Sequence, residues 1–253
     1  MDSTMPQFPI DVDDAAREAL VPTGRLRAGI NLNNPLLVTG RDDDGDPTGV
    51  SPSMAAALAD VLGVELVFVG FDRPGPLADA ATQDAWDIGN IGDDPARGEH
   101  IRFSRPYCEI EATYLVRSDS GIESVDEVDR TGRSIVTNAR AAYCLWLERN
   151  LEHAQLTQSS GHDESAAWFV EDEHDALGGL RPRLERDAER LPGTMVLPGS
   201  FTTITQAIGT PRARSEAGVA LLDRFVAAAI DTGFVADLID HHGAAGLSVP
   251  ASG

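Results

Sequence analysis

Residues 86–107 read WDIGNIGDDPARGEHIRFSRPY and decide how the rest of the chain is interpreted. The segment starts with a short apolar run typical of a strand, continues through a turn rich in Gly and Asp, and ends in Pro-Tyr. Arg97 lies in that turn, six residues before Phe103. An arginine stays charged and offers parallel N–H donors, so in a glycine-rich loop it suits a planar anion such as a carboxylate. The alternative is a surface arginine paired with Asp93 or Asp94.

Outward from this segment, strands and helices alternate. Residues 26–32 and 64–69 are predicted strands, and between them residues 51–62 are a predicted helix with Ser51 as N-cap and Pro52 in its first turn. A second, smaller cycle of strands and helices follows, and the last strong helix covers residues 213–231. This order predicts an α/β fold.

Composition excludes several classes of function. The 253 residues are 42% hydrophobic, enough for one large domain or two lobes. The formal charge of -21 repels phosphate backbones, so nucleic acid is not an expected partner, although a solvated surface alone would also explain the excess of acid. All 20 basic residues are arginine, which excludes chemistry that needs a lysine, such as a Schiff base.

The cysteines, the first residues and the histidines and aspartates of the chain give further expectations about its compartment and cofactors. Cys108 and Cys144 have neither CxxC nor zinc spacing, which favours two buried thiols and leaves a single bridge open. The acidic first residues carry Pro6 and Pro9 instead of a secretory signal, and no apolar run nears the roughly 20 residues that span a bilayer. We therefore expect a soluble chain, cytoplasmic or trimmed of a leader. Neither the histidines nor the aspartates of residues 42–46 form a metal motif, so no cofactor is expected.

Four motifs resemble the bacterial extracellular solute-binding proteins of family 3. They are LRAGI at 26–30, DPTGVSPSMAAALADVLGV at 46–64, the segment 86–107, and TGRSIVTNARAAYCLWL at 131–147. The resemblance covers about residues 24–243. It implies a two-lobed periplasmic-binding fold of type II, in which each lobe is a sheet flanked by helices and two hinge strands join the lobes.

The resemblance also implies domain boundaries. Lobe 1 is expected at residues 24–109 and 205–243, and lobe 2 at residues 110–204. Residues 1–23 are then an N-terminal extension, and residues 244–253 are expected to be a disordered tail.

Members of this family are receptors of ABC-type uptake systems for amino acids, and they close on a ligand between the lobes. By resemblance, Arg97 grips the ligand carboxylate, and Asn90 and Gly92 touch the same group. Further expected ligand contacts are Asn31 and Asn33 at the end of the first strand, Glu111 at the first crossing between lobes, and Ala141 and Arg181 in lobe 2. The implied partners are a small carboxylate-bearing solute and an ABC transporter permease, and the chain is expected to be a monomer.

Two departures from the family pattern bear on the ligand. Where the family usually places an acidic residue for the ligand ammonium, this chain has Leu180 and Arg181, and the usual Gly-Thr or Gly-Ser turn is Arg140-Ala141. If Arg97 and Arg181 both meet the ligand, a dicarboxylate fits better than an α-amino acid. Glu111 is the counter-argument, because it could replace the missing acid, or it could be an exposed strand residue.

Two other functions remain open from the sequence. Some proteins of this fold are cyclohexadienyl dehydratases, and Glu111 near an arginine-held carboxylate could act as the acid in such an enzyme. A cytoplasmic ligand sensor is the other alternative, suggested by the absence of an export signal.

Overall fold

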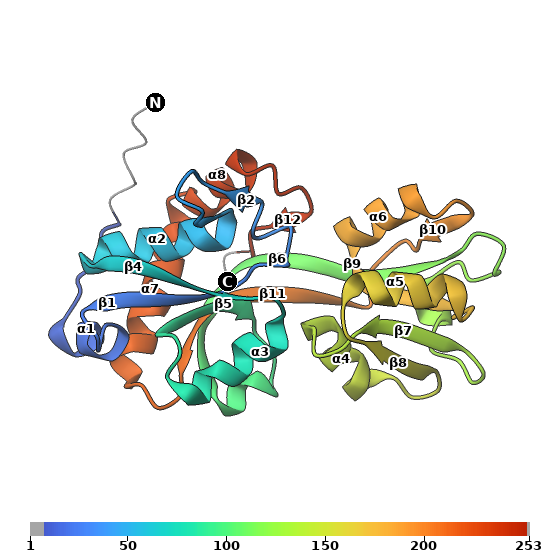
Figure 1. Cartoon of the computed structure of the whole chain (residues 1–253), viewed down its shortest axis with the longest axis horizontal. Coiled ribbons are helices and arrows are strands. Elements are labelled where there is room, and N and C mark those ends of the chain that lie inside the picture. Colours follow the sequence, from blue (N-terminus) through green and yellow to red (C-terminus); the bar gives the residue numbers. More distant parts are fainter. Residues whose placement is uncertain (1–7, 252–253) are drawn as a thin grey trace. The chain divides into compact units, whose positions relative to one another are not determined.

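The computed structural model describes residues 8–251 and divides the chain into two compact α/β units (Figure 1). Unit 1 contains the chain up to Glu109 and again from Thr205, and unit 2 is the continuous segment Ile110–Ile204. The chain passes between them within strand β6 (Ile101–Arg117) and again within β11 (Thr202–Pro211). Unit 1 is therefore discontinuous in sequence, and unit 2 is inserted into it.

The sheet of unit 1 has the strand order β4-β1-β5-β11-β6. Strand β1 (Arg25–Asn31) runs parallel to β4 (Glu65–Phe71) and to β5 (Ile88–Gly92), whereas β11 is antiparallel to β5. The carboxyl ends of β1 and β5 consequently lie at the same edge of the sheet. The remaining elements of unit 1 are α1 (Asp14–Leu20), β2 (Gly40–Arg41), β3 (Pro47–Thr48), α2 (Val50–Leu62), α3 (Pro74–Asp79), η1 (Ala80–Gln83), η2 (Arg97–Glu99), α7 (Glu216–Asp231), α8 (Phe234–His241) and β12 (Leu247–Ser248).

Helix α2 begins one residue earlier than the sequence predicts, and its N-cap is Gly49 rather than Ser51. Gly49 has a φ of 139°, which L side chains rarely adopt, and a Cβ there would collide with the carbonyl oxygen of Leu37. Ser51 lies inside the first turn and is buried, and its hydroxyl pairs with the Tyr107 hydroxyl at 2.7 Å. The predicted cap therefore serves a tertiary contact instead.

One face of the unit 1 sheet is covered by α3. Leu77 of α3 forms an apolar cluster with Trp86, Ile91 and Ile101, and the buried Trp86 indole donates to the Leu77 carbonyl at 3.0 Å. Gly29 of β1 allows this close approach, because a Cβ there would lie 2.6 Å from Leu77 Cδ1. Trp86 and Ile91 of the segment 86–107 thus form part of the core.

Both ends of the chain contribute to unit 1. Within the predicted extension, α1 contacts α7 and buries Ala16 and Leu20. Residues 244–251 differ from the expected disordered tail, because Ala244 and Leu247 are buried and β12 forms. Burial of these apolar side chains stabilises the segment, although its content of Gly and Ala predicted no ordered structure.

The sheet of unit 2 has the strand order β10-β6-β9-β7-β8. Strand β9 (Ala176–Leu180) is antiparallel to β6 and parallel to β7 (Ser134–Asn138), and its core neighbours include Phe169 and Leu184. The other elements are η3 (Val125–Glu127), α4 (Ala142–Asn150), β8 (Gln155–Ser159), α5 (His162–Glu171), α6 (Arg181–Arg190) and β10 (Thr194–Val196).

Three whole-chain expectations concern thiols, membranes and metals. Cys108 and Cys144 are both buried free thiols, as predicted. Within residues 8–251, no helix is both long enough and apolar enough to cross a bilayer. The same residues contain no group of His, Cys, Asp and Glu arranged to hold a metal ion.

A buried carboxylate holds three segments of unit 1 together. Asp87, just before β5, is fully buried, and its side-chain oxygens accept from the Arg27 backbone N–H at 2.9 Å and from the guanidinium groups of Arg27 and Arg214, at 2.7 Å and 3.0 Å for the closest pairs. Hydrogen bonding to Asp87 raises the pKa of Arg27 further above its ordinary value. This ion pair network connects β1, β5 and the chain after β11.

We expect Asp87→Asn to lower the free energy of unfolding by about 3–5 kcal/mol, because it leaves two arginines without a buried anion. Asp84→Asn is the matched control, since Asp84 contacts the same two arginines but its side chain is 68% exposed. It should cost less than about 1 kcal/mol. Urea denaturation of both variants measures the difference, and equal losses would contradict the assigned role of Asp87.

Candidate functional site

The carboxyl end of β5 carries the arginine singled out from the sequence. Arg97 is only 6% exposed, so it does not lie on the surface as the alternative interpretation expects, and its Nη1 donates to the Gly92 carbonyl at 2.5 Å. Asp94 is also buried, and its Oδ1 accepts from the Ala96 N–H at 2.9 Å, which fixes the turn that leads into η2. The structure thus brings Arg97 and Gly92 together and holds a buried cation at the edge of the sheet.

Asn90 lies at the same end of β5 and is 2% exposed. Its Nδ2 donates to the Ser51 carbonyl at 3.1 Å, which links β5 to the first turn of α2. Its Oδ1 is buried and has no hydrogen-bond partner within residues 8–251. Burial raises the pKa of Tyr107, which hydrogen-bonds to Ser51, so its hydroxyl stays protonated and able to donate.

The turn after β1 meets this edge as well. Ile30 lies opposite Asn90 in the β1–β5 register, so Asn31 and Asn33 follow at the same end of the sheet. Asn31 is half-buried, and its Oδ1 accepts from the Asn33 N–H at 3.3 Å, whereas Asn33 is exposed. Among the described residues, no group accepts a hydrogen bond from the Asn31 Nδ2, so this amide keeps two donor hydrogens.

The sequence suggests Asp93 only as a partner for Arg97. Thr205 of β11 donates its hydroxyl to Asp93 Oδ1 and accepts from the Asp93 N–H at 3.1 Å through its carbonyl oxygen. The hydroxyl contact is one that the spacing of the motif could not reveal, because the two residues lie 112 positions apart.

In unit 2, Glu111 and Arg181 form an ion pair, although in the sequence they argue for different ligands. Arg181 Nε donates to Glu111 Oε2 at 2.5 Å, and its Nη2 donates to the Gly199 carbonyl at 2.5 Å. The cause is the antiparallel register of β6 and β9, in which Ala112 lies opposite Leu180, so the next residues face each other. Each charge is therefore balanced by the other.

Ala141 is buried at the N-cap of α4, and its N–H donates to the Asn138 carbonyl at 3.3 Å. Between them, Arg140 adopts a left-handed conformation with a φ of 61°. Asn138 Oδ1 is buried and lacks a hydrogen-bond partner among the described residues, as Asn90 Oδ1 does in unit 1. Sequence reasoning missed Asn138, although its place between a predicted strand and the Arg140-Ala141 turn was a usable signal.

The family model for bacterial extracellular solute-binding proteins, family 3, matches residues 26–244. The chain belongs to this family. The family and the two-lobed α/β fold predicted from the four motifs are both confirmed. No curated protein sequence matches the chain.

Solved structures share the fold at low sequence identity. The cysteine-binding protein from Campylobacter jejuni is 18% identical, with a TM-score of 0.72 and coverage of 90% of this chain and 92% of that one. A mutant of ArgBP from T. maritima is 16% identical, with a TM-score of 0.71 and coverage of 90% and 99%. An ancestral amino acid-binding protein, described as a precursor of cyclohexadienyl dehydratase, is 20% identical, with a TM-score of 0.70 and coverage of 89% and 98%.

We expect Tyr107→Phe to lower the free energy of unfolding by about 1–3 kcal/mol, because the buried Ser51 hydroxyl loses its partner. Tyr114→Phe is the control, since the Tyr114 side chain is also buried, at 2% exposed, but its hydroxyl forms no hydrogen bond within residues 8–251. Chemical denaturation measures both. A loss at Tyr107 no larger than that at Tyr114 would show that the Ser51 contact does not stabilise unit 1.

Proposed function

We propose that this family 3 protein is the substrate-binding receptor of an ABC-type uptake system and that it closes on a small carboxylate-bearing solute, an amino acid or a related organic acid. The observation that carries the proposal is the buried Arg97 at the carboxyl end of β5. A buried guanidinium binds carboxylates strongly because its donors are fixed and poorly screened by solvent. The solved relatives named for arginine and cysteine binding support an amino acid or a similar solute.

The surroundings of Arg97 support a polar ligand rather than an apolar one. Asn90 and Asn31 lie at the same edge and supply amide groups, and Asn90 Oδ1 is a buried acceptor that still lacks a donor. Buried polar atoms are normally hydrogen-bonded, so an N–H or O–H group of a ligand, or a water molecule, would complete this site.

In unit 2, the charged side chains near the predicted ligand contacts are already paired, so they support only a small ionic contribution to ligand selection. Leu180 supplies no acid for a ligand ammonium, and Arg181 is already balanced by Glu111. We therefore propose that Arg97 supplies the main ionic contact and that the second anion site of a dicarboxylate is not preformed. The dehydratase alternative loses support for the same reason, because a carboxylate that accepts from arginine is poorly placed to deliver a proton.

We expect Arg97→Ala to weaken binding of a carboxylate ligand by about 2–5 kcal/mol, because the substitution removes a buried charge partner. The ligand is first found by a thermal-shift screen of amino acids, dicarboxylates, keto acids and prephenate-like compounds. Arg102→Ala is the control, since Arg102 pairs at 3.4 Å with Glu216, which is 89% exposed. Calorimetric titration of both variants would refute the assigned site if Arg97→Ala bound as tightly as the control.

We expect Glu111→Gln to raise the affinity for dicarboxylates severalfold relative to monocarboxylates, because it releases Arg181 from its counter-charge. Glu109→Gln is the control, two residues earlier in β6 and without the contact to Arg181. The two affinities are compared by titration for each variant. An unchanged ratio would show that Arg181 does not reach the ligand.

A further inference from the structure

The segment 93–100 connects β5 to β6, and each of its ends is bound to the chain of β11. At one end, the Asp93 N–H donates to the Thr205 carbonyl oxygen at 3.1 Å. At the other end, the N–H of Arg212, the residue after β11, donates to the His100 carbonyl oxygen at 2.7 Å. In the sheet, β11 lies between β5 and β6. The segment is therefore anchored to the strand that separates the two strands it connects.

Contacts inside the segment set its shape. The Ala96 N–H donates to Asp94 Oδ1 at 2.9 Å, and the Gly98 N–H donates to the Asp94 carbonyl oxygen at 3.0 Å. Arg97 lies between Ala96 and Gly98, and its guanidinium reaches back to the Gly92 carbonyl, five positions earlier. These bonds join near neighbours in the sequence and fix the conformation of the turn. The contacts with β11 differ from them, because they tie the turn to a distant part of the chain.

Two side chains add to the backbone contacts with β11. Thr205 Oγ1 donates to Asp93 Oδ1, and Arg212 Nη1 donates to the Gly98 carbonyl oxygen at 3.0 Å. Thr205 and Asp93 are both half-buried, whereas Arg212 is exposed. Water competes less for a half-buried pair than for an exposed one. The Thr205 hydroxyl is therefore the stronger of the two side-chain anchors.

The place of Thr205 in the chain gives this anchor a role in the candidate site. Thr205 is the first residue of unit 1 after the chain leaves unit 2, so its contact with Asp93 lies within unit 1. Binding groups work best when hydrogen bonds from the residues behind them hold them in place. We propose that Thr205 is a positioning residue: its hydroxyl holds Asp93, and through Asp93 the turn that presents Arg97 to a carboxylate. The inference rests on the proposed function, because it takes Arg97 as the ligand contact.

Hydrogen exchange of the full chain, read by peptide mass spectrometry, tests the anchor without a ligand. Thr205→Val keeps the size of the side chain and the backbone contact with Asp93, and it should speed exchange across residues 93–100 about tenfold, since one hydrogen bond is lost. Thr205→Ser retains the hydroxyl and should keep the original rate. Thr203→Val is the matched control, because Thr203 is exposed in the same strand and its side chain has no hydrogen-bond partner within residues 8–251.

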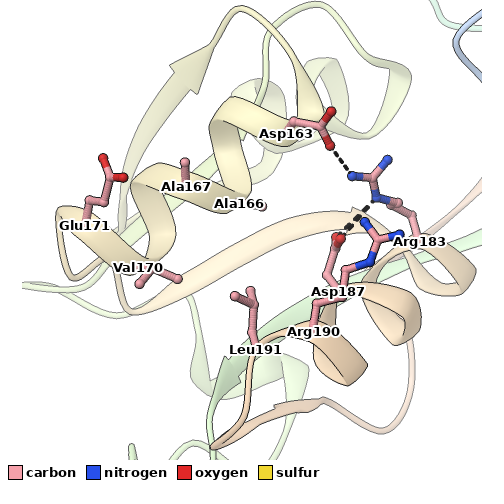
Figure 2. Close-up of a pocket in the computed structure, with 9 residues that line it drawn as sticks. All are labelled: Asp163, Ala166, Ala167, Val170, Glu171, Arg183, Asp187, Arg190 and Leu191. Atoms are coloured by element: carbon pink, nitrogen blue, oxygen red, sulfur yellow. Dashed lines mark hydrogen bonds and ion pairs between the residues drawn. The ribbon is translucent and has the colours of Figure 1, made fainter.

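The same contact can be broken from the other side. Asp93→Ala removes the acceptor and should also speed exchange about tenfold. The double variant Asp93→Ala/Thr205→Val should exchange no faster than either single variant, whereas independent effects would multiply to about a hundredfold. Asp163→Ala is the control for loss of a carboxylate, because Asp163 lines a pocket between α5 and α6 of unit 2 and pairs there with Arg183 (Figure 2). It should leave the exchange of residues 93–100 unchanged.

Calorimetric titration then tests whether the anchor serves binding. The probes are L-arginine, L-glutamate and succinate, which represent a cationic amino acid, an acidic amino acid and a dicarboxylate. Affinity for a probe that binds should fall about tenfold in Thr205→Val and be kept in Thr205→Ser, while both variants unfold at the same urea concentration as Thr203→Val. A purely structural role of Thr205 would lower stability without this change in affinity.

The outcomes separate this inference from the proposed function. If Arg97→Ala loses affinity but Thr205→Val binds as tightly as Thr203→Val, the inference is wrong and the proposed function stands. If Arg97→Ala binds as tightly as Arg102→Ala, the proposed function fails and the inference fails with it. If none of these probes binds, the exchange rates decide, and equal rates in Thr205→Val and Thr203→Val overturn the inference.

Discussion

The arrangement of unit 1 depends on the ion pairs that the fully buried carboxylate of Asp87 forms with Arg27 and Arg214. Asp87 immediately precedes β5 and binds arginines from β1 and from the chain after β11, so three distant segments share one anion. Strand β5 is five residues long, and its other end carries Asn90, Gly92 and the turn to Arg97. A shift of the strand at Asp87 would therefore move the candidate site at the opposite end, because a short buried strand transmits displacement rather than absorbing it.

Much of the fold could be predicted from local pattern. The strand–helix alternation and the segment ending in Phe-Ser-Arg-Pro-Tyr depend on neighbouring residues, and these local signals survive in a chain that shares less than 25% identity with its solved relatives. The N-cap of α2 could not be predicted in the same way. Gly49 is selected by the approach of Leu37, a contact that exists only in the folded unit, and this leaves Ser51 to bond Tyr107.

In the candidate site, too, contacts between residues close in sequence could be predicted, and contacts between distant residues could not. The turn from β5 to Arg97 is local, so the sequence could predict that Gly92 and Arg97 lie close together. The pair formed by Glu111 and Arg181 depends on the register of β6 and β9, and the two residues are 70 positions apart, so their charges looked independent in the sequence. Only the three-dimensional arrangement shows that the two charges neutralise each other.

The two buried cysteines have a practical consequence. Cys108 lies in unit 1 and Cys144 in unit 2, and burial raises the pKa of the Cys144 thiol to about 11 and that of Cys108 further. Thiolates are the reactive form and both side chains are fully buried, so alkylating reagents react with each cysteine only when the structure around it opens. Pulse alkylation followed by peptide mass spectrometry would thus report the opening rate of each unit separately, with a natural probe in each and no engineered label.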